Sequence, residues 1–143
     1  MKLPDDMHGA VLDLAAALVH ASERADTRAK WRLYGELRDY CEAEAAARRE
    51  HPFLWETLAD FTTDERVAIG FYRRALAVAE QMGASEYQAS IRLELAQRHL
   101  ELDEHAIACA YALAADEQAR ELDDLDLRRA ISQFLLDHLP VSR

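Results

Sequence analysis

Histidines and carboxylates near position 100 are the residues of this chain best suited to chemistry. Imidazole and carboxylate groups are ligands of several transition metals. Five of them follow one another across one turn: His99, Glu101, Asp103, Glu104 and His105. Because their spacing matches no established metal-ligand pattern, we interpret His99 and His105 first as packing residues. A metal-dependent enzyme stays the less favoured alternative.

A second acid–histidine pair, Asp5-x-x-His8, has the spacing that places both side chains on one helix face. A di-iron bundle needs two such motifs and two further glutamates. The sequence has no G-x-S-x-G turn and no glycine-rich loop before a helix, and Cys41 and Cys109 form no C-x-x-C pair. It therefore predicts no catalytic residue, no cofactor and no metal site, and a function other than catalysis.

The elements that would position any site are helices. Half of the 143 residues are apolar, which is enough for a hydrophobic core. The chain has only four Gly and three Pro but many Ala, Leu, Glu and Arg, which favour helices. We expect an all-α protein with one domain over residues 1–143. The two cysteines lie inside predicted helices and are interpreted as small buried apolar residues.

The net charge of −10 restricts the class of partner. Residues 101–143 alone carry ten acids against four Arg, and such a field repels phosphate backbones and anionic membranes. We expect no nucleic acid and no membrane as partner, and a protein partner with a basic or polar surface. An acidic balance also keeps many proteins soluble, so the charge by itself does not require a partner.

No segment has the pattern of a secretory signal or of a transmembrane helix. The apolar stretch Ala10–Val19 is interrupted by Asp13 and is preceded by Asp5 and Asp6. The longest charge-free run, Ala106–Ala115, has ten residues and is too short to cross a bilayer. Together with cysteines that suit a reducing compartment, these features predict a cytoplasmic protein.

Apolar residues spaced three and four apart predict about seven helices. Their expected positions are 6–22, 27–49, a short helix from Pro52, 64–82, 85–102, a helix after Asp103, and 124–139. Trp31 and Trp55 share the spacing of the apolar residues around them, so we interpret both as core residues rather than as partner anchors. The sixth helix is apolar all round and is expected at the centre of the stack.

Turn and cap residues predict several helix ends. Thr62-Thr63-Asp64-Glu65 and Ser85-x-x-Gln88 have the spacing of capping boxes, and Asp103 is placed to cap the sixth helix. Pro52 suits the first turn of the third helix, and Gly83 suits a left-handed C-cap after the fourth.

A pattern recurs with an offset of forty residues. Ala75-Leu76-x-x-Ala79-x-x-x-Gly83 returns as Ala115-Asp116-x-x-Ala119-x-x-x-Asp123, each time at the end of a long helix. Self-similarity at this period indicates stacked helix pairs. The second copy exchanges an apolar and a turn residue for charge, as is typical of the end of a stack.

The residues from Ala75 to Asp124 resemble a long-helix variant of the tetratricopeptide repeat. The first-helix positions of that family are filled by Arg92, Leu95, Ala96 and His99, and the second-helix positions by Ala108, Ala112 and Ala115. A preceding unit has Trp55, Leu58 and Ala59, then Ala68, Tyr72, Ala75 and Leu76. Arg92 replaces the family's aromatic residue and Ala its Gly. Trp31-x-x-Tyr34-Gly35 leaves a third, divergent unit open. The resemblance implies a tetratricopeptide-like solenoid, clearest over 52–124, with a capping helix over 124–139.

The resemblance also implies a groove lined by the first helix of each pair. Its expected partner-binding residues are Arg32, Glu36, Asp39, Glu56, Asp60, Ser90, Glu94, Gln97 and Glu101. A solvated helix face is the alternative interpretation.

The leading hypothesis is a protein–protein interaction module that binds its partner stoichiometrically, for example an immunity or inhibitor protein that neutralises a basic toxin or nuclease. The alternatives are a secretion chaperone or adaptor and a peptide-binding regulatory domain. Homodimerisation stays open.

Overall fold

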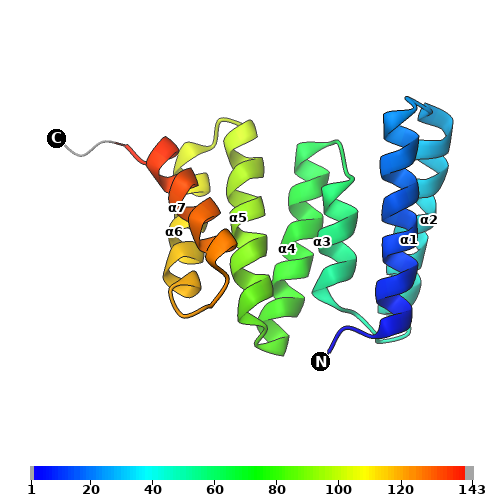
Figure 1. Cartoon of the computed structure of the whole chain (residues 1–143), viewed down its shortest axis with the longest axis horizontal. Helices are drawn as coiled ribbons and strands as arrows, with labels where there is room; N and C mark the ends of the chain where they lie inside the picture. The colour runs from blue at the N-terminus through cyan, green and yellow to red at the C-terminus, as the bar shows by residue number, and fades with distance from the viewer. Residues whose placement is uncertain (1, 141–143) are drawn as a thin grey trace.

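Seven α-helices make up most of residues 2–140, the part of the chain that this computed structural model describes. They are α1 (Asp5–Glu23), α2 (Thr27–Ala46), α3 (Pro52–Asp60), α4 (Glu65–Met82), α5 (Ser85–Glu101), α6 (His105–Ala119) and α7 (Leu125–His138). The helices stand in a row from the α1–α2 hairpin to α7, and neighbours along the chain pack together (Figure 1). The expected all-α fold of stacked helix pairs is confirmed.

Short polar side chains and one glycine fix several helix ends. Three aspartates accept a hydrogen bond, at 3.0–3.1 Å, from the backbone N–H three residues further on: Asp26 before α2, Asp64 before α4 and Asp124 before α7. Gly83 closes α4 in the left-handed region, with φ of 65°. Pro52 occupies the first turn of α3, as predicted.

Other predicted caps are wrong. Neither α5 nor α6 has a side-chain cap, because Ala84 and Glu104 occupy the N-cap positions and Asp103 lies in the preceding turn with φ of 59°. The amide of Gln88 donates instead to the carbonyl of Ala79 at 3.1 Å, which ties α5 to the end of α4. The hydroxyl of Thr62 donates to the carbonyl of Leu58 at 2.8 Å rather than capping α4.

Helix α2 is shorter than predicted. It ends at Ala46 and not near residue 49, because Ala47 is its C-cap and Arg48 turns into the left-handed region with φ of 60°. The alanine- and charge-rich tail gives no apolar stripe that would hold a longer helix against its neighbours.

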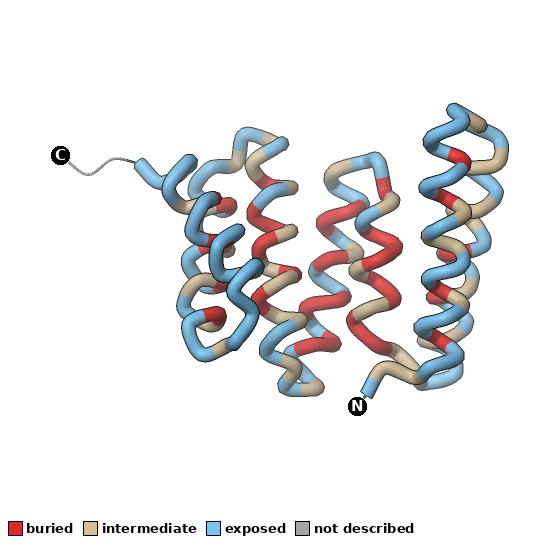
Figure 2. The backbone as a smooth tube through the Cα atoms, in the orientation of Figure 1, coloured by how far each residue is buried: buried red, intermediate tan, exposed pale blue. Residues whose placement is uncertain are grey.

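The core lies mainly between α3, α4 and α5, where buried positions are most frequent (Figure 2). Trp55, Tyr72, Leu54 and Leu58 have no exposed surface there and join the residues that α1 and α2 bury. A second cluster near the C-terminal end is built largely from alanines, which allow α5 and α6 to approach closely: Ala89, Ala96, Ala108, Ala112, Ala115 and Ala119.

The structure corrects the expected place of the sixth helix. Its alanine stripe faces α5, but Ile107 is 44% exposed and Leu113 is 49% exposed on the other side. Helix α6 therefore lies near the end of the row and not at its centre. Among the helices of residues 2–140, none has both the length and the apolar character needed to cross a membrane.

Candidate functional site

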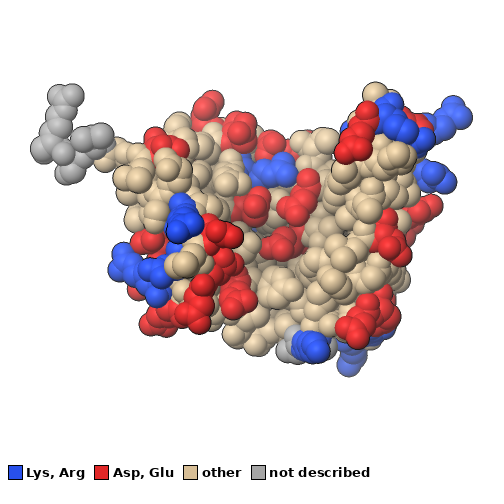
Figure 3. All heavy atoms as spheres, in the orientation of Figure 1, with Lys and Arg blue, Asp and Glu red and all other residues tan. Residues whose placement is uncertain are grey.

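Carboxylates from two helices meet in the middle of one face. Glu56 and Asp60 are four residues apart on α3 and so share one side of that helix, and Glu94 approaches from α5. Tyr72 reaches them from α4, and Arg98 lies one turn after Glu94. We call these five residues the acidic hollow. Figure 3 shows acidic atoms gathered in a depression over α3–α5.

Tyr72 joins the carboxylates of the two helices. Its ring is buried in the core, while its hydroxyl donates a hydrogen bond to Oδ1 of Asp60 and lies 3.5 Å from Oε2 of Glu94. Burial, the hydrogen bond to Asp60 and both neighbouring carboxylates raise the pKa of Tyr72. The phenol thus stays protonated and remains a donor over the physiological pH range.

The three carboxylates lie close to one another and are unequally covered, because Glu56 and Glu94 are partly buried and Asp60 is exposed. Burial, together with the smaller effect of the neighbouring charges of Asp60 and Glu94, raises the pKa of Glu56 to about 8. Burial also raises the pKa of Asp60 and of Glu94, although Asp60 keeps contact with solvent at the open side of the hollow. Within the described residues, the buried Oε2 of Glu56 has no hydrogen-bond partner.

Arg98 compensates this negative charge only in part. It partly offsets the raised pKa of Asp60 and of Glu94. Its guanidinium, however, donates to Glu65 at 3.2 Å and to backbone carbonyl oxygens of Thr62 and Ala59 at 3.4 Å. Among residues 2–140, no cation offsets the raised pKa of Glu56. The arrangement is therefore suited to binding a further positive charge beside Glu56.

The structure brings together three of the nine partner-binding residues predicted from the sequence: Glu56, Asp60 and Glu94. Ser90 is partly buried one turn before Glu94 on α5. Three others are exposed on α2, which is the second helix of the first pair and packs on α1 and α3: Arg32, Glu36 and Asp39.

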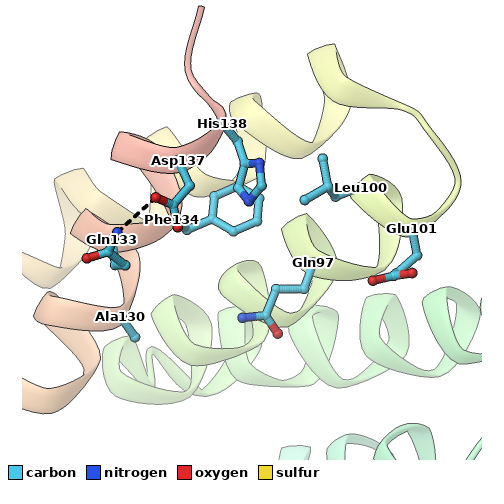
Figure 4. A pocket seen from close by; sticks show the side chains of 8 residues that line it. All are labelled: Gln97, Leu100, Glu101, Ala130, Gln133, Phe134, Asp137 and His138. Carbon is cyan, nitrogen blue, oxygen red and sulfur yellow. Dashed lines mark hydrogen bonds between the residues drawn. The ribbon is translucent and has the colours of Figure 1, made fainter.

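The last two predicted residues, Gln97 and Glu101, line a separate cavity of about 420 Å³ between α5 and α7. Figure 4 shows Gln97 and Glu101 on the α5 side of this cavity and Phe134 and His138 on its α7 side. The rings of Phe134 and His138 are 4.6 Å apart, and Gln133 donates to Asp137 at 2.9 Å. This cavity lies beside the last helix and shares no lining residue with the acidic hollow.

The histidines near position 100 have separate environments. Nδ1 of His99 lies 3.0 Å from Oε1 of Glu104, and its ring stacks on Tyr111 with centroids 5.5 Å apart, as a packing residue would. His105 is exposed. In the part of the chain that the structure describes, no three His, Cys, Asp or Glu side chains are placed to hold a metal ion.

Sequence reasoning missed two members of the hollow. Tyr72 was expected only as a core residue, and nothing in its spacing shows that its hydroxyl reaches carboxylates on two other helices. Arg98 had a signal, because Glu94-x-x-x-Arg98 is the favourable order of an i, i+4 pair on a helix.

The comparisons with known proteins give no match. No family model matches the chain, and neither a curated protein nor a solved structure is significantly similar to it. The interpretation of the hollow therefore depends on its residues alone.

Proposed function

We propose that this chain binds a protein partner through the acidic hollow, which accepts a lysine or arginine side chain of that partner. The observation that carries this proposal is Glu56, whose pKa is raised to about 8 and whose buried Oε2 has no hydrogen-bond partner among residues 2–140. Burying a carboxylate without a hydrogen bond or a counter-charge is costly, and a cation placed beside it recovers much of that cost.

Binding of a cation is coupled to proton release. With a pKa of about 8, Glu56 is largely protonated at pH 7, and a positive charge beside it favours the ionised form. The affinity for a basic side chain should therefore increase between pH 6 and pH 9. Calorimetry in two buffers of different ionisation enthalpy should detect a proton released at pH 7.

The stacked helix pairs support a partner-holding function, because such stacks present extended surfaces to other proteins. The resemblance to the tetratricopeptide repeat supports the same class. An inhibitor that neutralises a basic toxin or nuclease fits the charge of the hollow. An inhibitor should abolish its partner's activity on binding, whereas the cargo of a chaperone or adaptor should stay active.

A selection from random dodecapeptides displayed on phage tests the proposal. We expect one family of selected peptides to be rich in Lys and Arg. A synthetic peptide of that family should bind the variant Glu56→Gln/Asp60→Asn/Glu94→Gln at least about tenfold more weakly than the unmodified chain. The matched control replaces the same three types of carboxylate by amides on exposed residues at the end of α6 and after it: Glu117→Gln/Glu121→Gln/Asp123→Asn.

Two results would overturn the proposal. One is a selection without basic peptides. The other is a basic peptide whose affinity falls equally in the control variant, since that would reflect net charge and not the hollow.

A further inference from the structure

The first two turns of α2 carry a surface of opposite chemistry to the acidic hollow. Trp31 is 75% exposed there, although its spacing predicted a core position, and this prediction is wrong. Arg28 lies one turn before Trp31 on the same side of the helix, and Arg32 follows Arg28 at the next i, i+4 position. We call Arg28, Lys30, Trp31 and Arg32 the Trp31 surface.

The cations of this surface have no counter-charge. Arg24 pairs with Asp26 and Arg38 with Asp39, but within residues 2–140 no ion pair or hydrogen bond involves the side chains of Arg28, Lys30 or Arg32. Arg28 and Arg32 form a like-charge pair, which disfavours a helix. Figure 3 shows Lys and Arg atoms gathered at the end of the α1–α2 hairpin where α2 begins.

An exposed tryptophan between unpaired arginines is typical of an interface. Tryptophan and arginine are the residues most enriched among those that dominate binding energy, and an indole can cover a large apolar area when a partner excludes water from it. Next to Trp31 on the same face, Gly35 presents no side chain, and a Cβ placed there would meet no atom within 4 Å. The indole therefore stands beside open space that a partner chain can enter.

We propose that the Trp31 surface binds an acidic segment of a protein partner. The inference is independent of the acidic hollow and goes beyond the function proposed for it. Carboxylates of such a segment would pair with Arg28 and Arg32, and an apolar residue between them would cover the indole of Trp31. Charge complementarity selects this class of partner, because the Trp31 surface is basic in a chain with a net charge of −10.

The same charges disfavour phosphate-rich partners. Nucleic acids and anionic membranes are held by many cations at once, and this surface offers three unpaired ones. Glu36 and Asp39 are exposed further along α2 and would repel a wide anionic surface. A short acidic segment can contact the first two turns of α2 without reaching them.

The same phage-displayed dodecapeptide selection tests this proposal when the selected peptides are examined for acidic sequences. We expect a second family, rich in Asp and Glu with an apolar residue among them. A synthetic peptide of that family should lose at least about tenfold in affinity for Trp31→Ala and for Arg28→Glu/Arg32→Glu. The controls are Leu136→Ala, which removes a side chain of a residue that is 79% exposed, and Arg128→Glu/Arg129→Glu, which changes two exposed arginines of α7.

The outcomes separate the two proposals. Acidic peptides that the controls weaken as much as the Trp31 variants, or a selection without acidic peptides, would overturn this inference and leave the acidic hollow untouched. Binding of vesicles with phosphatidylserine or of duplex DNA, lost in Trp31→Ala, would overturn it in favour of those ligands. Sedimentation that shows a dimer abolished by Trp31→Ala would assign the surface to a second copy of the chain and overturn it as well.

Discussion

The two tryptophans begin similar stretches of sequence and end in opposite environments. Trp55 is fully buried, its Nε1 donates to Glu50 at 2.9 Å, and the guanidinium of Arg74 lies 3.7 Å from the centre of its ring. Trp31 is 75% exposed. The difference comes from position in the stack, because α3 is enclosed by other helices and the face of α2 that carries Trp31 packs on none.

The charged residues of the acidic hollow and of the Trp31 surface also differ in their exposure to water. Glu56 and Glu94 of the acidic hollow lie where protein partly replaces water, and burial raises the pKa of both and of the more exposed Asp60. Two cations of the Trp31 surface, Arg28 and Arg32, are exposed to solvent, and Lys30 is partly exposed. The acidic hollow has three carboxylates and the Trp31 surface has three cations, but their environments differ. Substitutions in the hollow should therefore change the free energy of unfolding far more than substitutions at the start of α2.

The largest expected effect comes from truncating each tryptophan in turn. Trp55→Ala should lower the free energy of unfolding by about 3–5 kcal/mol, because it leaves a cavity among α3, α4 and their neighbours. Trp31→Ala should change it by less than about 0.5 kcal/mol, since the side chain is mostly in water already. Urea unfolding monitored by far-UV circular dichroism measures both. Similar losses of unfolding free energy in the two variants would show that Trp31, like Trp55, is packed against other residues in solution.

The next effect is the gain in stability at high pH that follows from replacing Glu56 by glutamine. The pKa of Glu56 is raised from 4.5 to about 8, so the folded state holds its proton where the unfolded chain has lost it. Stability from this group is therefore greatest below pH 4.5, falls as the pH rises, and reaches its lowest value above pH 8. Glu56→Gln removes the ionisation and should stabilise the fold by about 1–3 kcal/mol at pH 9, with little change at pH 5.

An exposed glutamate on the adjacent helix provides the control for this effect. Glu80→Gln on α4 should leave the pH dependence of stability unchanged, because Glu80 is solvated. If the free energy of unfolding of Glu56→Gln follows that of the unmodified chain from pH 5 to pH 9, the carboxylate of Glu56 is not desolvated and its pKa is not raised.

A smaller effect is expected from the hydroxyl that joins the two helices. Tyr72→Phe keeps the ring in the core and removes the hydrogen bond to Asp60, at an expected cost of about 1 kcal/mol. In a double-mutant cycle, Asp60→Asn and Tyr72→Phe should show a coupling energy because the two side chains interact directly. Additive changes in the free energy of unfolding would mean that the hydroxyl and the carboxylate act independently.

The sequence predicts elements better than environments. The apolar spacing, Asp64, Gly83 and Pro52 locate helices to within a few residues, because these signals act within one helix. They leave open which face of α2 or α6 is covered, so Trp31 was predicted buried and α6 central. Glu56, Asp60 and Glu94 were predicted for one groove, but their desolvation depends on Tyr72 and on three helices packing together. Such contacts join residues far apart in the chain.

The smallest effect is spectroscopic and tests whether Trp31 is uncovered in solution. With 75% of Trp31 exposed and Trp55 buried, acrylamide should quench mainly the emission of Trp31. Trp31→Phe should therefore remove most of the quenchable signal and leave a blue-shifted emission from Trp55. For an indole that is uncovered in the free chain, we expect quenching that does not depend on protein concentration. Protection that increases with concentration would instead show self-association at this surface, and the buried and exposed tryptophans would then differ only in the free monomer.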